Sequence, residues 1–418
     1  MANKKLLRVL TLKDAVGIGL GAIIGAGIFV VTGVAAGVSG PAFIVALLIA
    51  GTIATFNALS SAQLAAVYPQ SGGTYEYGYR LLNPILGFSA GWMFLMSKLA
   101  AGSVVAIGFG SYFYQLVQVG SPLILSAAAI VFLTLANIFG IKKTGYLNLV
   151  IVGFTIFSLL YLVISGAPEV NQENFTPFAP FGLPGIAEAT ALLFFAFTGY
   201  ARIATLAEEV KNPEKTIPKA IIITIIAAIL LYAAVSLVAV GVIGAQEMAG
   251  SKSPLQLVAN NLTTPLIGVV ITIGASTAML GVLLSQILGI SRMMFAMGRR
   301  KDLFPIFEKI HDRYNVPHIG ILITGVIILL LLFLGTFEFI LAAAAFTILL
   351  YYSITNIAAL KQAPGEQRFG KIVPVLGLLG CLALAFSLDR NVILSGVGLL
   401  IFGFLLRFFL HKYSHVNH

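Results

Sequence analysis

The sequence Gly17-Ile-Gly-Leu-Gly-Ala-Ile-Ile-Gly-Ala-Gly-Ile-Phe29 lies within the first long apolar run of the chain. A helix that crosses a bilayer satisfies its own backbone hydrogen bonds, so residues that open it at mid-membrane need a cavity to face. Gly21, Gly25 and Gly27 fall near the middle of this run. We therefore predict a break in the first membrane helix.

The composition around this run is that of a membrane protein. The chain has 418 residues, of which 59% are hydrophobic and 10% are charged. Soluble domains carry about 25% charged residues, so a water-soluble, disordered or nucleic-acid-binding chain is excluded despite the net charge of +10. The apolar runs show no alternation of period two, which argues against a membrane barrel. The predicted fold class is an all-α polytopic membrane protein.

A membrane helix needs about 20 mainly apolar residues, and the apolar content suffices for about twelve of them. The predicted spans are residues 14–39, 41–67, 84–114, 121–140, 144–166, 184–209, 217–243, 263–298, 318–335, 338–360, 372–388 and 391–411. They are grouped as five helices in 14–166, five helices in 184–360 and two further helices in 372–411. Residues 1–13 and 412–418 are expected to be cytoplasmic ends.

The distribution of Lys and Arg sets the expected orientation, because cytoplasmic loops of membrane proteins carry an excess of both. With the N-terminus inside, 22 of the 25 Lys and Arg residues lie in inside segments. Only Lys252 and Arg390 lie outside, and Lys98 remains within the membrane. This predicts cytoplasmic N- and C-termini in a multi-pass protein of the cell membrane.

A second interruption is predicted in the sixth span. The sequence Phe194-Phe-Ala-Phe-Thr-Gly-Tyr200 places Thr198 and Gly199 near its middle. Interrupted helices at matching positions of two halves indicate the binding site of an inverted-repeat transporter. The alternative is that the glycines of the first span form a small-residue stripe for close helix packing. A dinucleotide-binding motif is rejected, because the glycines follow no strand.

Opened helices supply a specific chemistry. The N-terminus of a half-helix carries about half a positive charge, and a half-helix C-terminus carries about half a negative charge. One end therefore suits a carboxylate and the other an ammonium group. This pairing favours a zwitterion such as an α-amino acid.

Three further motifs accompany the two already quoted: Pro69-Gln-Ser-Gly-Gly-Thr-Tyr75, Glu208-Glu-Val-Lys-Asn-Pro-Glu-Lys-Thr-Ile-Pro218 and Ser291-Arg-Met-Met-Phe-Ala-Met297. Together the five motifs resemble those of the amino acid, polyamine and organocation transporter superfamily. The resemblance covers essentially the whole chain and is strongest to bacterial relatives of the cationic and heteromeric amino acid transporters. It implies the LeuT-like fold: two inverted five-helix repeats with discontinuous helices 1 and 6, followed by two C-terminal helices, twelve in all.

The resemblance also implies the residues of the site. The substrate carboxylate is expected at the backbone N–H groups of Gly25, Ala26 and Gly27, and the amine at carbonyls of Ile23, Phe195, Ala196 and Thr198. Phe197 and Tyr200 are candidates for a gate or a pocket wall, with simple packing in the bundle as the alternative.

Two departures from the family pattern concern charge. Some cation-selective relatives carry a carboxylate on the third span where Ser97 stands here, and many carry an acid where this chain has Ala201. Their loss predicts a neutral, small or medium apolar amino acid. Several relatives also place a lysine on the fifth span at the position of Thr155, where sodium-coupled members bind the ion.

Lys98 is expected to replace that missing ammonium group. It lies about 21 Å into the third span, too deep to reach the membrane surface easily. An ionisable group at such depth is a functional hypothesis by default, the alternative being a structural hydrogen bond to helix carbonyls. We expect proton-linked or sodium-independent transport. A sodium symporter stays open because Thr155 and Ser285 are hydroxyls suited to a cation site.

The remaining classes fit less well. No Walker motif indicates ATP drive. A channel is the second class and would show filter-like loops. An intramembrane enzyme would bring His, Asp or Glu together within spans, and none converge there. The predicted function is secondary active transport of an amino acid by alternating access, with the lipid bilayer as surroundings, no cofactor or metal, and no obligate protein partner. The alternatives are a sodium-coupled symporter and a cationic amino acid or polyamine exchanger.

Overall fold

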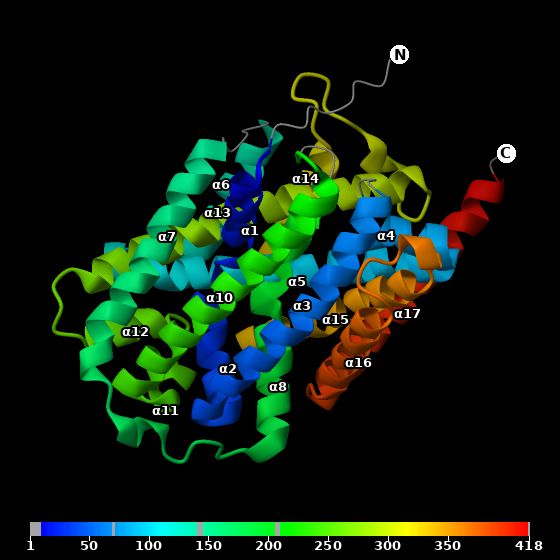
Figure 1. The fold of residues 1–418 in the computed structure, drawn as a ribbon. Helices are drawn as coiled ribbons and strands as arrows, with labels where there is room; N and C mark the ends of the chain where they lie inside the picture. Colours follow the sequence, from blue (N-terminus) through cyan, green and yellow to red (C-terminus); the bar gives the residue numbers. More distant parts are fainter. Residues whose placement is uncertain (1–9, 69–71, 140–144, 205–209, 417–418) are drawn as a thin grey trace.

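The computed structural model describes residues 10–68, 72–139, 145–204 and 210–416 (Figure 1). Within these ranges every named element is helical, and Leu10 and Val210 form a single isolated backbone bridge. Parts of two quoted motifs, residues 69–71 and 208–209, lie outside the described residues, as does the end of the predicted span 184–209, residues 205–209.

The long helices follow the apolar runs of the sequence. They are α3 (Phe43–Val67), α5 (Pro84–Val117), α6 (Pro122–Ile138), α7 (Gly145–Gly166), α10 (Pro213–Ile243), α13 (Ile267–Arg299), α14 (His318–Leu331), α15 (Phe337–Leu360), α16 (Ile372–Phe386) and α17 (Arg390–Val416). Two further runs are interrupted. The first comprises α1 (Leu12–Ile23), η1 (Gly27–Val31) and α2 (Thr32–Ser39), and the second comprises α8 (Gly182–Phe194), η6 (Phe195–Tyr200) and α9 (Ala201–Ala204).

Short helices occupy the connections. They are η2 (Gly40–Ala42), α4 (Thr74–Tyr77), η3 (Gly78–Leu82), η4 (Ala167–Glu169), η5 (Gln172–Phe175), α11 (Ala245–Ala249), α12 (Pro254–Asn260), η7 (Pro305–Glu308) and η8 (Pro364–Glu366). None of these was predicted. They are too short for the periodicity of a membrane helix to reveal them.

Among the described residues, eight helical runs are long and apolar enough to cross a membrane. One of them, Leu12–Val67, has 56 residues. As a straight helix it would measure about 84 Å, more than twice the roughly 30 Å of a hydrocarbon core, so it must be divided. The helices α6, α14 and α16 are shorter apolar helices of 10–17 residues. The chain is a multi-pass membrane protein.

Local sequence explains where several helices begin. Thr11 and Asp14 form a capping box at the start of α1, in which the Thr11 N–H donates to Asp14 Oδ2 at 2.8 Å. At the start of α5 the side chain of Asn83 accepts from the Leu86 N–H at 2.8 Å, and Pro84 occupies the first helical position. Polar caps, joined by a proline in α5, therefore set where these helices begin.

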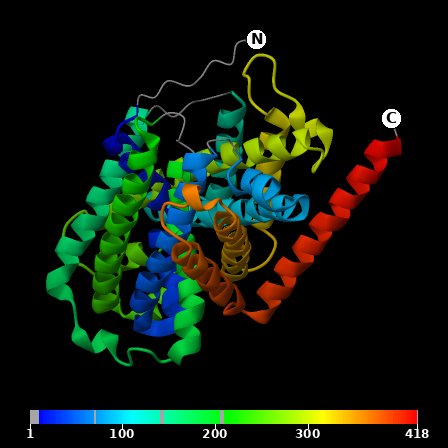
Figure 2. The same cartoon turned by 45° about the vertical axis from the view of Figure 1, so that its right-hand side comes forward.

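Helix α5 lies at the centre of the bundle, and α17 lies at its edge. In their most apolar windows, 78% of α5 but only 17% of α17 is buried inside the protein. Figure 2 shows α17, in red, running along the outside of the other helices. The lateral surface of α17 is thus left for lipid.

The helices α5 and α13 run antiparallel with close contact at two levels. A Cβ on Gly91 would lie 3.0 Å from Met297 Sδ, and a Cβ on Gly108 would lie 2.9 Å from Met279 Sδ. The order of the partners is reversed along the two helices. This register places Lys98, seven residues after Gly91, near the level of Ile290.

Candidate substrate site

The first span is broken where the glycines predicted it. Helix α1 ends at Ile23, and Ile24 has an extended backbone with φ −76° and ψ 106°. The chain becomes helical again at Ala26 and continues as the π-helix η1. The predicted break is confirmed at Ile24 and Gly25.

The sixth span differs from the expectation. Its middle is a 3₁₀-helix, η6, and the flanking residues Phe194 and Ala201 both have right-handed helical backbone. The expectation of an unwound chain at Thr198 and Gly199 is therefore corrected to a tightened one. The Thr198 hydroxyl donates to the Phe195 carbonyl at 3.0 Å, which suits the three-residue repeat of a 3₁₀-helix.

The two interruptions touch through their backbones. A Cβ on Gly27 would lie 2.5 Å from Ala196 Cα, and a Cβ on Gly199 would collide with the Ala22 carbonyl oxygen. A side chain of any size at either glycine would push the segments apart. The glycines are required for this close approach.

A cavity of about 1020 Å³ lies beside this contact. It is lined by nine of the predicted site residues: Ile23, Gly25, Ala26, Gly27, Phe195, Ala196, Thr198, Lys98 and Ser285. The structure thus brings together, around one space, the residues that the resemblance assigns to the substrate. Phe197, Tyr200 and Thr155 do not line it.

Three tyrosines missing from the sequence-based site bind the backbone of the interrupted segments. Tyr232 donates its hydroxyl to the Ile23 carbonyl at 2.9 Å, and Tyr352 donates to the Thr198 carbonyl at 3.3 Å. Tyr112 donates to the Phe29 carbonyl at 2.6 Å. Tyrosines inside apolar spans were the available signal, because a buried phenol requires a hydrogen-bond partner. Two of the carbonyls expected to bind the amine therefore already accept a phenol.

The two candidate gate aromatics pack within the bundle. Phe197 is fully buried, with its ring 5.5 Å from that of Tyr232. Tyr200 is also fully buried, and its ring lies 5.3 Å from that of Tyr352. Both therefore support the tyrosines that bind the interrupted segments.

The hydroxyls of the expected cation site lie far apart. Thr155 Oγ1 is 3.5 Å from the Gly274 carbonyl on α13, and Ser285 follows Gly274 by eleven residues. That spacing corresponds to about 16 Å along a helix. Oxygen ligands lie within about 2.6 Å of a bound cation, so Thr155 and Ser285 do not share one.

Of the two positions at which relatives carry an acid, Ser97 and Ala201, only one lines the cavity. Ser97 is buried and donates to the Ala344 carbonyl at 2.8 Å on α15, and it does not line the cavity. Ala201 and Lys98 line it. The prediction of a neutral substrate is therefore supported by the position of Ala201 and not by that of Ser97.

Lys98 is one of the residues that line the cavity. Its Nζ lies 5.9 Å from the centre of the Phe94 ring, a cation–π contact. In the described part of the chain no carboxylate forms an ion pair with it. Nor do three or more His, Cys, Asp or Glu side chains gather there as metal ligands. Lys98 is thus a cation available to an anionic group in the cavity.

The cavity has one open and one closed end. Arg292, Arg299 and Arg300 line it and are exposed, so it opens where α13 ends. At the other end the Tyr112 hydroxyl accepts the Leu255 N–H of α12 at 3.1 Å. A Cβ on Gly33 of α2 would lie 2.9 Å from the carbonyls of Met248 in α11 and of Ser251, so this end is tightly packed.

Comparison with known proteins identifies the family of the chain. The amino acid permease family profile matches residues 10–410. A Mycobacterium tuberculosis protein described as an uncharacterised transporter is 36% identical over 95% of this chain and 90% of its own length. The branched-chain amino acid permease of Bacillus subtilis is 30% identical over 99% and 96%, and the methylthioribose transporter of that organism is 32% identical over 99% and 95%. The chain is a transporter that belongs to the amino acid permease family.

Proposed function

We propose that this protein is a secondary active transporter of a neutral amino acid and that it works by alternating access. One observation carries the proposal: the break at Ile24 and Gly25 opens the first span directly beside the cavity. In this proposal the backbone N–H groups of Gly25, Ala26 and Gly27 bind the substrate carboxylate. Because the contacts are made by main chain, they serve any α-amino acid and leave the choice of side chain to the walls.

The proposed architecture is the LeuT-like fold with twelve membrane crossings. Supporting it, the interrupted runs are the first and sixth of the sequence and meet at Gly27 and Ala196. The proposed repeats are residues 14–166 and 184–360, with 372–411 added. A 3₁₀ segment in the sixth run can bind the substrate amine as an unwound segment would. In this proposal the Thr198 carbonyl releases the Tyr352 hydroxyl and accepts the amine in its place.

The charges on the cavity wall support a neutral substrate. Lys98 and three arginines line the cavity, and Glu76 is the only carboxylate among its lining residues. Glu76 is itself paired with Arg300. A cationic side chain would meet net positive charge at short range, where repulsion is strong. This disfavours the alternative of a cationic amino acid or polyamine exchanger.

The side chain of the substrate is proposed to be apolar and of medium size. Val105 and Val282 line the cavity, and Val282 approaches within 3.0 Å of the position of a Cβ on Gly25. Aliphatic side chains therefore line the cavity, and one of them, Val282, lies beside the break. That the Bacillus subtilis relative is named a branched-chain amino acid permease accords with this choice.

We further propose that Lys98 provides the positive charge that sodium supplies in sodium-coupled members. It is the cation deepest in the cavity, and Thr155 and Ser285 are too far apart to form a sodium site together. Transport is then proton-linked or independent of ions. The cytoplasmic location of both termini belongs to the same proposal, so the end lined by Arg299 and Arg300 faces the cytoplasm and the structure is inward-open.

The test is uptake by purified protein in proteoliposomes. We expect saturable uptake of branched-chain amino acids, acceleration by the same amino acid inside the vesicle, and no change when sodium is replaced by choline. Conduction without trans-acceleration would identify a channel. Competition by lysine or putrescine as strong as that by leucine would refute the neutral specificity, and loss of uptake in choline would refute the role of Lys98.

A further inference from the structure

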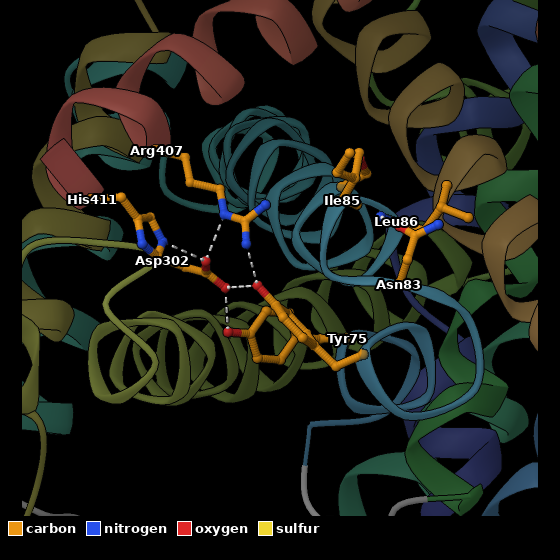
Figure 3. Close-up of polar contacts among 9 residues, drawn as sticks. Tyr75, Asn83, Ile85, Leu86, Asp302, Arg407 and His411 are labelled. Atoms are coloured by element: carbon orange, nitrogen blue, oxygen red, sulfur yellow. Dashed lines mark hydrogen bonds and ion pairs between the residues drawn. The ribbon is translucent and has the colours of Figure 1, made fainter.

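A buried carboxylate joins three distant segments at the open end of the bundle. Asp302, just beyond α13, has a side chain that is 1% exposed. It accepts hydrogen bonds from the hydroxyls of Tyr75 at 2.7 Å and Tyr79 at 2.6 Å, and from Arg407 Nε of α17 at 2.9 Å. Figure 3 shows Tyr75 and Arg407 converging on Asp302. We call these four residues the Asp302 clasp.

The elbow formed by α4 and η3 presents two faces. Gly73, Thr74, Glu76 and Tyr77 line the cavity close to its opening. Tyr75 and the residue one turn later, Tyr79, point to the Asp302 side instead. The clasp therefore fixes the elbow from behind, on the side opposite the cavity.

The elbow is also fixed to the end of α13 on its exposed side. Arg300 is paired with Glu76, and its guanidinium lies 4.5 Å from the centre of the Tyr79 ring. Burial raises the pKa of both Tyr75 and Tyr79, so each stays a neutral donor to Asp302. The position of the cavity opening thus depends on contacts that converge on Asp302 and Arg300.

Arg407 connects this arrangement to the most peripheral helix. Its Nη2 donates to the Tyr79 hydroxyl at 3.0 Å, and its side chain is 17% exposed. His411, one turn later, lies 3.7 Å from Asp302 Oδ1. Eight residues before Arg407 on α17, the Leu399 carbonyl accepts a hydrogen bond from Trp92 Nε1 of α5 at 2.8 Å. A helix that is otherwise largely left to lipid is attached through these polar contacts.

A buried carboxylate is stable only when it is paired, and removal of its partner leaves an uncompensated charge. Arg407 is the cation that forms two of the contacts within the clasp. If it is removed, the elbow loses its anchor on α17 and Asp302 keeps only the phenols and His411. The elbow would then no longer be fixed where the structure shows it.

We propose that the Asp302 clasp positions the elbow so that the cavity stays open at this end, and that α17 thereby takes part in opening and closing. Asp302 and Arg407 are positioning residues in this role, since neither lines the cavity. This role of the clasp depends on the cavity and not on which substrate enters it. Either the role of the clasp or the proposed amino acid specificity can therefore be refuted while the other stands.

The experiment measures access to the cavity directly. The sequence has one cysteine, Cys381, and it is buried, so a Cys381→Ala background has no thiol of its own. Ala296→Cys then adds a thiol in the cavity wall. Its labelling by a membrane-impermeant maleimide is timed in purified protein carrying Arg407→Gln, Arg407→Lys or Lys412→Gln. Lys412 is exposed on the same helix, so its variant removes an equal charge without touching Asp302.

We expect Arg407→Gln to shift the ratio of open to closed protein about tenfold towards closed, which corresponds to about 1.4 kcal/mol. If open and closed protein are about equally populated in the parent, labelling then slows about fivefold, and the maximal uptake rate falls with little change in KM. Arg407→Lys should recover part of both, and Lys412→Gln should match the parent. Equal labelling rates in Arg407→Gln and Lys412→Gln overturn the proposal. If Arg407→Gln does not fold, Tyr79→Phe replaces it, with the same two outcomes.

Discussion

Replacing Gly27 by alanine tests the backbone contact on which the proposed site depends. The added Cβ would lie 2.5 Å from both Cα and Cβ of Ala196. Carbon atoms in ordinary contact are about 3.5–4.0 Å apart, so the two segments must separate by about 1 Å. Since Ala196 Cα is a backbone atom, no rotation of a side chain can relieve the collision.

The cost of this displacement can be estimated. Overpacking a well-packed interior typically costs about 1–3 kcal/mol, and about 1.4 kcal/mol corresponds to a factor of ten in an equilibrium constant. A displacement of about 1 Å also misplaces groups that must act together. We therefore expect Gly27→Ala to weaken substrate binding at least about fivefold and to reduce uptake further.

The assay pairs this variant with a control in the same cavity. Gly289 also lines the cavity, but a Cβ there has nothing within 4 Å. Gly289→Ala should leave binding unchanged and stabilise α13 by up to about 1 kcal/mol through helix propensity. Binding is followed by the thermal shift that leucine induces, and transport by uptake into proteoliposomes. Equal leucine affinity in the two variants would refute the reasoning.

Three further predictions concern polar groups in the membrane. Lys98→Gln should lower uptake at least tenfold and flatten its dependence on pH, whereas Lys98→Arg should keep more activity; an unchanged rate and pH profile for Lys98→Gln would remove Lys98 from the mechanism. Tyr232→Phe removes the hydroxyl that donates to the Ile23 carbonyl. Because one hydrogen bond contributes about 0.5–1.5 kcal/mol, the freed carbonyl should let leucine bind about two- to tenfold more tightly, as measured by titration, and weaker binding would contradict this. Asn356 of α15 donates a hydrogen bond to the Asn57 side chain of α3. Asn356→Leu should lower the free energy of unfolding by about 1–3 kcal/mol, measured by thermal unfolding with tryptophan fluorescence, and an unchanged midpoint would show that the bond is dispensable.

The positions of the long helices could be predicted because they depend on local properties. Length of the apolar run and capping residues such as Asn83 are both visible in the sequence. The break at Gly25 was equally local. The tightening of η6 was not, because Gly199 packs on the Ala22 carbonyl of another segment, and only the folded chain brings them together.

The site could be predicted where the main chain forms it and not where side chains complete it. Gly25, Ala26 and Gly27 belong to one continuous motif. The Asp302 clasp instead joins residues separated by 227 positions, from Tyr75 to Asp302, and by 105 positions, from Asp302 to Arg407. No short motif encodes such partners, and a single sequence gives no means of pairing them.

The segments at the two interruptions are connected at a second place as well. The Lys211 N–H, just after Val210, donates to the Leu10 carbonyl at 2.9 Å, ahead of α1. Together with the contact of Gly199 against Ala22, this gives α1 one attachment to the sixth run near its C-terminal end and another, ahead of its N-terminal end, to the residues just before α10. A helix attached near both of its ends cannot tilt independently of the segments that hold it. Any tilt of α1 must therefore move the residues around Gly199 with it, so the two interrupted segments that line the cavity move together.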